Sequence, residues 1–541
     1  MTMKLKNIFS AVTAAAMLTA CVGDLNTIPL NETDVTSETA YGADEAGYVQ
    51  GLTKIYFQLV SNNTQDLQVA DGGASEFIRA FWSTQEVTAD AAKCAWGDAW
   101  VNDLNNNTWK GDVLNDAVYA VYVRTLQGIT YVNEYLRQTS DANLDLRGCS
   151  ADVKAKVQEY RAEARFLRAF FYWAAMDTFG QVPFSTENTQ FGGGYNPPQA
   201  PAAEIFDFIV SELNDLASDG SAMPAAQSNY PRADKGSVLG LLARVYLNAE
   251  VYTGTAMWAE AKATCEKIYS LGYALAPTHA ELFRGDNGEN PDAKKEMLFA
   301  ASYNAEHTQS YGGTTYLTLS TLSGDDGAVN IIGINGGWAG NRVPDHYVQT
   351  YFAPTAADFA TGDYTIADKR AYFYIKGRSQ SMQDNLNTFL NGWSCIKFNN
   401  VPHDVDAVDY AATAATKNFS DIDWPLIRLG EIHLIYAEAC MHAGGDASAQ
   451  VKALAERAGV AAPATIDADF LMAERARELM WEGHRRTDLI RFGKWISGYN
   501  WTYKGGNFGG QDLPEHFNVF PVPSTELATN LDLQQNPGYA R

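Results

Sequence analysis

Residues 159–184 read EYRAEARFLRAFFYWAAMDTFGQVPF, and their apolar positions recur every three or four residues. This spacing places the apolar side chains along one face of a single helix, which predicts a buried face. Gly180 and Pro183 end the helix, because glycine favours a left-handed cap and proline cannot continue a helix. The residues of the predicted buried face are Ala162, Phe166, Ala169, Phe170, Trp173 and Met176.

The polar side of this helix repeats like charges. Glu159 and Glu163 lie four residues apart, and so do Arg161 and Arg165. Each pair repels within the helix, so we expect the partner charges on other helices. We predict interhelical ion pairs to Glu163, Arg165 or Arg168. The expected partner segments are that of Arg428 with Glu438 and that of residues 478–486.

The whole chain has the composition of a folded globular protein. It has 541 residues, of which 46% are hydrophobic and 19% charged, and its net charge is -24. This negative charge makes nucleic acid and anionic membrane surfaces unlikely partners. The chain is 12% aromatic, and many of the aromatic residues fall in Gly- and Asn-rich stretches where burial explains them less well.

The N-terminus predicts an export signal and a lipid anchor. A short basic region precedes an apolar run at 8–17 that is too short to span a bilayer. Residues 18–21, LTAC, then read as a bacterial lipobox. This pattern predicts a lipoprotein signal peptide at 1–20, lipidation of Cys21 and a flexible tether at 21–35, with the rest of the chain outside the membrane. The alternative is an ordinary secretory signal with a chance cysteine.

Helical patterns alternate with two irregular, aromatic inserts at 61–111 and 286–423. The helices at 232–249 and 257–271 have small residues where they would cross, a packing similar to that of tetratricopeptide repeats. No linker divides the chain into independent domains. The other predicted helices are 38–59, 112–138, 202–216, one that begins with Asp423 as its cap and Pro425 in its first turn, and 467–495.

Four stretches together resemble the SusD/RagB family of outer-membrane nutrient-binding lipoproteins. They are EARFLRAFFYWAAMDTFGQVPF, RADKGSVLGLLARVYLNAEVYTG, WPLIRLGEIHLIYAEA with ERARELMWEGHRRTDLIRFGKW, and FPVPSTELATNLDLQQNPGY. The resemblance implies a mostly α fold, a tetratricopeptide-like scaffold whose long loop inserts form the ligand-binding face. It implies one intertwined unit with an N-terminal region at 36–285 and a C-terminal region at 286–541. It also implies a SusC-type TonB-dependent transporter as partner, and a place on the outer membrane facing outside.

The resemblance extends to the starch-binding founder of the family, and it implies a ligand site. Residues 77–98, FIRAFWSTQEVTADAAKCAWGD, resemble the segment that supplies one stacking tryptophan and a nearby arginine, which places these roles on Trp96 and Arg79. The stretches YGGTTYL and GGW place two more stacking aromatics at Tyr311 and Trp338. Asp98, at the end of the first segment, completes the predicted site.

A neutral polysaccharide offers apolar C–H faces and a rim of hydroxyls. Flat aromatic side chains bury those faces at low entropic cost, and a few polar side chains bind the hydroxyls. An arc of aromatics suits a curved α-glucan better than a flat chain. The competing interpretation is that the aromatics fill the core, which we expect for Trp173 and Trp481 on their helical patterns. Trp82 and Trp100 stay undecided.

Two other functions stay open. A lipid-anchored glycoside hydrolase needs only two carboxylates, but the 64 acidic residues offer many chance pairs and no catalytic motif singles one out. A lid for a non-glycan nutrient such as peptide is the other.

We expect no catalysis and no cofactor, although residues 286–290, DNGEN, have oxygen ligands for a structural calcium. We interpret six charged helix residues as structural cross-bracing: Glu163, Arg428, Glu438, Glu478, Glu482 and Arg485.

Overall fold

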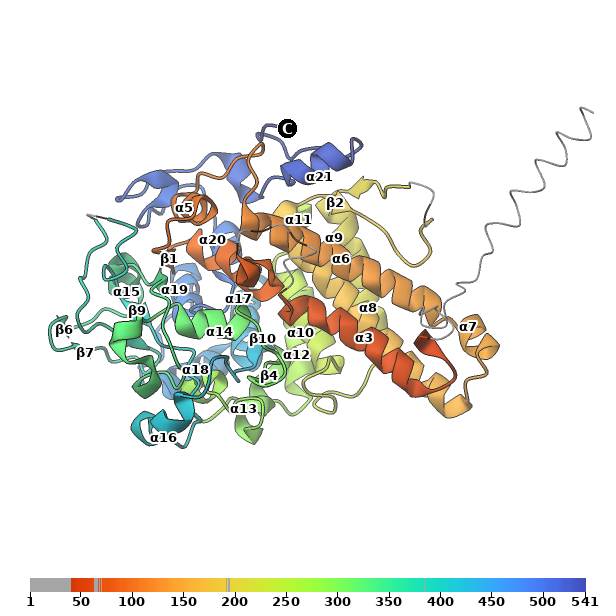
Figure 1. The fold of residues 1–541 in the computed structure, drawn as a ribbon, viewed down its shortest axis with the longest axis horizontal. Coiled ribbons are helices and arrows are strands. Elements are labelled where there is room, and N and C mark those ends of the chain that lie inside the picture. The colour runs from red at the N-terminus through yellow and green to blue at the C-terminus, as the bar shows by residue number, and fades with distance from the viewer. Residues whose placement is uncertain are drawn as a thin grey trace, which may run out of the picture.

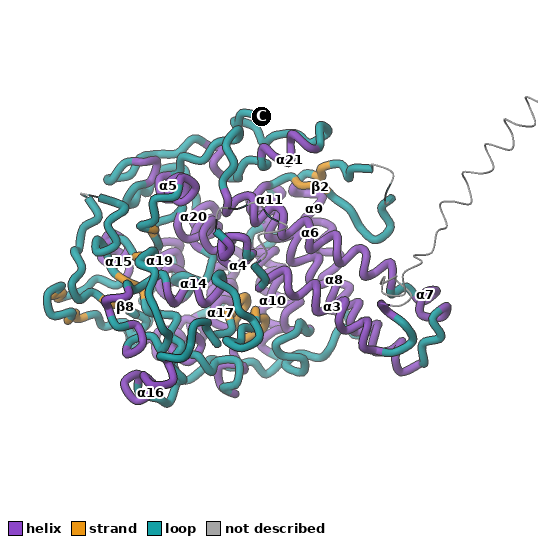
Figure 2. The backbone as a smooth tube through the Cα atoms, in the orientation of Figure 1, coloured by secondary structure: helices purple, strands orange, loops and turns teal. Residues whose placement is uncertain are grey.

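The computed structural model describes residues 40–62, 67, 69, 71–190, 192, 195–383 and 385–541. The predicted signal peptide, the lipidation site Cys21 and the tether at 21–35 lie outside these residues. Helices dominate the described part of the chain, and every sheet in it has two strands. The prediction of a mostly α fold is therefore confirmed (Figure 2).

Long helices stack on one another to form the scaffold, which lies at the right and centre of Figure 1. Each helix but the last packs against its predecessor, and the last packs against the helix two places before it, in a series similar to that of tetratricopeptide-like units. In order along the stack they are α3 (Glu45–Val60), α6 (Asp116–Gln138), α8 (Ala151–Phe179), α9 (Ala202–Ala217), α10 (Lys235–Leu247), α12 (Trp258–Tyr269), α17 (Leu429–Ala443), α18 (Ser448–Ala458) and α19 (Ala468–Glu478).

Helix α8 is the helix predicted from residues 159–184, and it begins about two turns earlier than that stretch, at Ala151. The Ser150 side chain caps it by accepting a hydrogen bond from the Val153 amide at 3.2 Å. It ends at Gly180, whose φ of 71° is in the left-handed region, as predicted. All six residues of the predicted face are buried, Trp173 among them.

The charges of α8 do pair with other elements, but the predicted partners were wrong. Arg232, just before α10, donates to Glu163 with an Nε–Oε2 distance of 2.9 Å. Arg165 and Arg168 both pair with Glu212 of α9, each at 2.9 Å. The partners come from the elements near α8 in the stack, and sequence alone does not say which helices those are.

The later charged segments pair with one another instead. Arg428 contacts Glu478 at 2.7 Å, Glu482 at 2.6 Å and Glu296 at 3.0 Å, and all four side chains are at most 1% exposed. Glu438 pairs with Arg491 at 2.6 Å. The interpretation of these residues as cross-bracing is therefore confirmed, because every one of these charges is buried and paired.

The helix expected to start at Asp423 begins later. Residues 424–428 form strand β10 (Trp424–Arg428), which pairs antiparallel with β4 (Met297–Ala301), and α17 follows at Leu429. Asp423 accepts hydrogen bonds from the Tyr303 amide and the Tyr230 hydroxyl, so its carboxylate is used in tertiary contacts and not as a helix cap. The pair β4–β10 brings the two ends of the second insert together at one place on the scaffold.

The expected helix 467–495 is two helices, α19 and α20 (Arg485–Arg491). Between them Trp481 has a φ of 65° and Gly483 a φ of 79°, conformations that a continuous helix does not contain. The buried Glu86 carboxylate accepts the Gly483 and His484 amides, and the Trp481 indole donates to the Ala91 carbonyl at 2.9 Å. These contacts with the first insert hold the break.

The two inserts are more structured than expected, and parts of both pack against the long helices: the first against α3 and α6, and the second, through β4, against α10. Most of the second insert lies at the left of Figure 1. The first insert contains a short helix directly after Glu76. Every residue from 73 to 95 is buried, so this segment has no polar face and its sequence shows no helical period.

The remaining helices are α4 (Phe77–Trp82), α5 (Ala99–Asn106), α7 (Asp141–Leu146), α11 (Ala249–Thr253), α13 (Pro291–Glu296), α14 (Gly313–Leu319), α15 (Asp345–Tyr351), α16 (Ala407–Ala414) and α21 (Ser524–Thr529). The remaining strands are β1 (Lys93–Cys94), β2 (Val182–Pro183), β3 (Gln199–Ala200), β5 (Asn341–Arg342), β6 (Ala356–Asp358), β7 (Asp363–Thr365), β8 (Phe373–Tyr374) and β9 (Ser394–Cys395).

Candidate functional site

The two inserts meet through a short antiparallel pair, β1 with β5. The pairing continues beyond the strands, where the Ala95 amide donates to the Gly340 carbonyl at 2.9 Å. It brings Trp96 next to Trp338, and the Trp96 indole N–H donates to the Trp338 carbonyl at 3.0 Å. Residues more than 200 positions apart therefore form one site.

A surface cavity of about 360 Å³ lies at this junction, a volume within the usual range for ligand sites. Six residues line it: Asp71, Arg79, Trp96, Asp98, Tyr311 and Trp338. Five of the six are the site residues predicted from the sequence, and the structure brings all five together. Asp71 is the one lining residue that the sequence did not single out.

Two of the three aromatic rings of the cavity, those of Tyr311 and Trp338, face different directions. Tyr311 is 54% exposed, and Trp96 and Trp338 are half-buried. The ring centres of Tyr311 and Trp338 are 6.2 Å apart, and their planes are inclined by 51°. A straight, flat molecule cannot lie on both faces at once, whereas one that turns between the two rings can.

The position of the Trp96 ring is fixed by its packing against Arg79 and Gly340. The Arg79 guanidinium lies 5.3 Å from the Trp96 ring and 4.4 Å from the Tyr316 ring, and it pairs with Asp71 at 2.6 Å. A Cβ atom at Gly340 would lie 2.8 Å from the Trp96 indole, so only glycine lets the ring pack this closely. Because the Arg79 side chain is only 2% exposed, its main contribution is to fix the Trp96 ring.

Tyr311 stands next to a loop that is anchored by a buried carboxyl group. The Glu76 carboxyl is hydrogen-bonded to the hydroxyls of Ser310 and Tyr303, and Gly312 packs directly against it. Burial raises the pKa of Glu76 from 4.5 to about 8, although the hydrogen bonds and nearby arginines oppose that shift. The carboxyl group is therefore protonated at neutral pH and holds the loop as a neutral hydrogen-bonding group.

Known proteins share this architecture over almost the whole chain. The starch-binding protein SusD of Bacteroides thetaiotaomicron is 31% identical over 575 aligned residues, which cover 99% of each chain. The chain belongs to the SusD family. The SusD family model matches residues 273–539, and a model described as starch-binding and associating with the outer membrane matches residues 58–247. The family is one of glycan-binding proteins.

Solved structures of SusD-like proteins agree with this fold. A SusD superfamily protein from Parabacteroides distasonis has a TM-score of 0.69 at 21% identity, covering 94% of this chain and 100% of its own. Surface glycan-binding protein A from Bacteroides thetaiotaomicron, solved with laminarihexaose, has a TM-score of 0.67 at 18% identity, covering 91% and 99%. At these identities the likeness establishes the fold of this SusD-family chain. The domain limits at 36–285 and 286–541 stay predictions.

The structure adds one aromatic residue beside the SusD-family site. The Phe419 ring is half-buried, and its centre lies 5.2 Å from that of Tyr311 with the planes again inclined by 51°. It stands alone in a polar stretch, so no sequence pattern marks it. Asp71 carries no signal either, because its pairing with Arg79 is a tertiary contact.

Trp82 and Trp100, which the sequence left undecided, belong to the core of this SusD-family protein. The Trp82 side chain is 0% exposed, and its indole donates to the Trp481 carbonyl at 3.0 Å. Trp100 is 8% exposed. Neither residue lines the aromatic cavity.

The possible calcium loop at 286–290 uses its side-chain oxygens internally. Asp286 accepts a hydrogen bond from the His403 amide at 3.0 Å, and Asn287 accepts one from the Asp423 amide at 2.8 Å. Asn290 caps α13 through its side chain. Within the described ranges, no group of three or more His, Cys, Asp or Glu side chains is placed to hold a metal ion. A structural calcium here stays an untested prediction.

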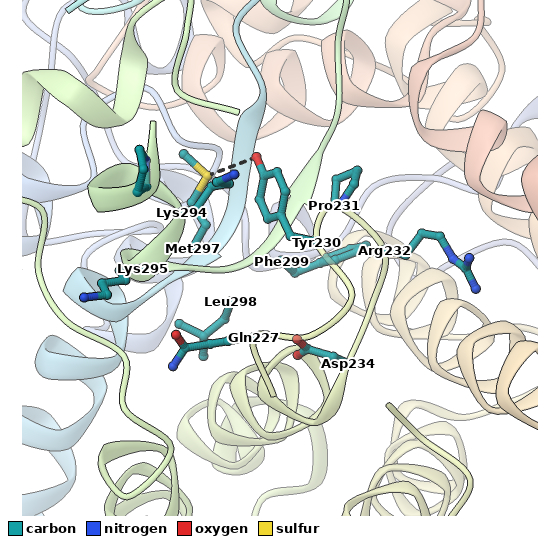
Figure 3. A pocket seen from close by; sticks show the side chains of 11 residues that line it. Gln227, Tyr230, Pro231, Arg232, Asp234, Lys294, Lys295, Met297, Leu298 and Phe299 are labelled. Carbon is teal, nitrogen blue, oxygen red and sulfur yellow. Dashed lines mark hydrogen bonds between the residues drawn. The ribbon is translucent and has the colours of Figure 1, made fainter. Parts of the chain in front are cut away.

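A different kind of cavity, of about 250 Å³, lies on the scaffold between the loop at 227–234, which precedes α10, and the segment formed by α13 and β4 (Figure 3). Tyr230 stands at its centre, with its hydroxyl 3.5 Å from the Met297 sulfur, and Lys294 and Lys295 lie on one side. Arg232 on the other side is already paired with Glu163. This lining is charged, and it lacks the cluster of exposed aromatic faces found in the first cavity. The candidate ligand site of this SusD-family chain is therefore the aromatic cavity at the junction of the inserts.

None of the helices in the described part of the chain is both long enough and apolar enough to cross a membrane.

Proposed function

We propose that this protein binds a neutral, starch-like α-glucan at the aromatic cavity without cleaving it. The observation that carries the proposal is the convergence of Trp96, Tyr311 and Trp338 on one cavity, in which the ring planes of Tyr311 and Trp338 are inclined to each other. Each ring offers an apolar face to a sugar ring, and the polar side chains between them bind hydroxyls. The inclination favours a chain that curves, as an α-glucan does. The 31% identical relative named as a starch-binding protein supports the same substrate class.

The carboxylates of the cavity support binding rather than hydrolysis. A glycosidase needs one carboxylic acid that is kept protonated by an apolar setting and a second that acts as base or nucleophile. Asp71 pairs with Arg79, and Asp98 is exposed to solvent. The buried Glu76 carboxyl is used by Ser310 and Tyr303 and does not line the cavity. Neither carboxylate of the cavity lies in a buried, apolar setting, which supports binding without cleavage.

We further propose that the protein is an outer-membrane lipoprotein that delivers the glucan to a SusC-type TonB-dependent transporter. The lipobox ending at Cys21 supports the anchor, and the family model described as associating with the outer membrane supports the location. Replacing Cys21 by serine and following incorporation of labelled palmitate tests the anchor. Label in the Cys21→Ser protein equal to that in the wild type contradicts it.

The binding and catalytic parts of the proposal are tested together on the purified protein. Calorimetry with maltoheptaose, laminarihexaose and a peptide mixture establishes the ligand class, and an assay of reducing ends after incubation with soluble starch establishes turnover. We expect heat of binding with maltoheptaose and no new reducing ends. Binding of peptide alone favours the non-glycan lid, and steady release of reducing ends favours the hydrolase.

A further inference from the structure

A second groove lies apart from the aromatic cavity, with a volume of about 400 Å³. Three segments distant in sequence form it: the start of α15, the loop around Met382, and residues 500–509. We call it the Phe508 groove. Its lining residues are Asp345, His346, Gln349, Ser381, Met382, Asn500, Trp501, Thr502, Phe508 and Gly509. Its volume is within the range of small-molecule sites.

Phe508 is presented to solvent by a rigid glycine-rich loop. Residues 505–510 read GGNFGG, and three of the four glycines have φ values between 63° and 79°, which other residues rarely adopt. The loop is closed by a hydrogen bond from the Gln511 side chain to the Gly505 carbonyl at 2.6 Å. Phe508 is 37% exposed, and its ring meets the Tyr503 ring edge-on at 5.7 Å. A phenylalanine fixed in this way offers an apolar face outward and does not fill the core.

The polar groups of the groove are mostly neutral, and two of them, on Thr502 and Asn500, are uncommitted. Thr502 is only 9% exposed, yet its hydroxyl makes no hydrogen bond to any described residue, and the same is true of the exposed Asn500 amide. Both groups can therefore hydrogen-bond a ligand without breaking a contact within the protein. Asp345 is the one acidic lining residue, its Oδ1 accepts from the Trp393 indole, and no lysine or arginine lines the groove. The lining therefore suits a neutral, hydroxyl-rich ligand better than an anion.

One stretch of chain touches both sites. Met382 lines the Phe508 groove, and its carbonyl accepts a hydrogen bond from the Tyr503 hydroxyl at 2.9 Å. Five residues later, the Asn387 amide donates to the Trp96 carbonyl at 3.2 Å. The same stretch of chain therefore contacts both the groove and the aromatic cavity.

We propose that the Phe508 groove is a second binding site for a neutral glucan chain. Phe508 stacks on one sugar ring, and Thr502 and Asn500 bind its hydroxyls. The proposal rests on the proposed function only for the ligand class, because the groove shares no lining residue with the aromatic cavity. A second site on the same protein strengthens the retention of long polysaccharides more than that of short oligosaccharides, since it raises the effective concentration of the chain.

Hydrogen exchange separates the two sites because it reports on each segment. The purified Trp96→Ala protein is measured with and without maltoheptaose, and with laminarihexaose and cellohexaose as further probes. We expect a glucan to slow amide exchange at 499–511 in this variant. In the same background, Phe508→Ala is expected to abolish this slowing of amide exchange and to weaken glucan binding about tenfold. Phe508→Tyr is expected to retain both the slowed exchange and the binding. Val408→Ala is the matched control, because Val408 is an exposed apolar residue remote in sequence from both sites.

The outcomes distinguish this proposal from the proposed function. Protection at 499–511 with none at 310–340 in the wild-type protein supports the groove and contradicts the aromatic cavity as the glucan site. Protection at 310–340 in the wild type, with none at 499–511 for any probe, overturns the groove and leaves the proposed function standing. Protection at 499–511 that survives Phe508→Ala also overturns the assignment.

Discussion

The buried carboxyl group of Glu76 makes the stability of this protein depend on pH in a defined direction. Its pKa is about 8 in the folded protein and 4.5 ordinarily. The unfolded chain therefore loses this proton at lower pH than the folded chain does. The stabilisation from Glu76 is complete below pH 4.5 and is lost as the pH rises to about 8. A gap of about 3.5 pH units at 1.36 kcal/mol per unit gives a change of about 5 kcal/mol in the free energy of unfolding.

The perturbation is Glu76→Gln, which keeps the size and a hydrogen-bonding group but removes the titration. Urea unfolding of both proteins at pH 5 and pH 8.5 measures the free energy of unfolding. We expect the wild type to lose several kcal/mol more than the variant between these pH values. Burial also raises the pKa of Glu86 to about 8, but this contribution is common to both proteins and cancels in the comparison. Equal pH dependence in the two proteins refutes the reasoning.

Three further perturbations follow from the geometry. Glu478→Ala leaves the buried Arg428 guanidinium short of a partner and is expected to cost about 3–5 kcal/mol in urea unfolding; a loss below 1 kcal/mol contradicts the bracing role. Gly340→Ala pushes the Trp96 indole out of place, so we expect weaker maltoheptaose binding in calorimetry and a melting temperature close to that of the wild type. Unchanged affinity for maltoheptaose contradicts the claim that the position of the Trp96 ring matters for binding. Phe419→Ala is expected to weaken the same binding about tenfold if this ring extends the aromatic face.

The scaffold was predictable where local pattern and tertiary packing agree. Helix α8 has an uninterrupted apolar face, and Gly180 supplies the left-handed residue that ends it, so the sequence contains both signals. At the break near Trp481 the one local signal is Gly483, and the conformation of the break depends on distant contacts. It is held by Ala91 and Glu86, which lie almost 400 positions earlier, and a helical pattern read locally runs straight through it.

Strand β10 shows the same competition between local and distant signals. Asp423 and Pro425 form a sound local helix start, but pairing with β4 satisfies the backbone of residues 424–428. The ion pairs of α8 failed for a related reason. Charge repetition indicates that Glu163 needs a partner, and only the stacking order of the helices selects Arg232.

The candidate site was predictable only through resemblance. Trp96, Tyr311 and Trp338 have no common spacing, and the β1–β5 pairing that joins them is two residues long in each strand. Resemblance located the residues because it carries a spatial arrangement that periodicity does not. It did not locate Phe419 or Phe508, which became visible only when their neighbours were placed in space.

Native affinity electrophoresis in gels containing amylopectin tests the central claim most directly, that the aromatic cavity binds an α-glucan. Wild type, Trp96→Ala, Tyr311→Ala and the Val408→Ala control are run beside a protein that does not bind starch. We predict that the wild type and the control are strongly retarded and that both cavity variants migrate faster than the wild type. Free migration of the wild type, or unchanged retardation of Trp96→Ala and Tyr311→Ala, contradicts the account.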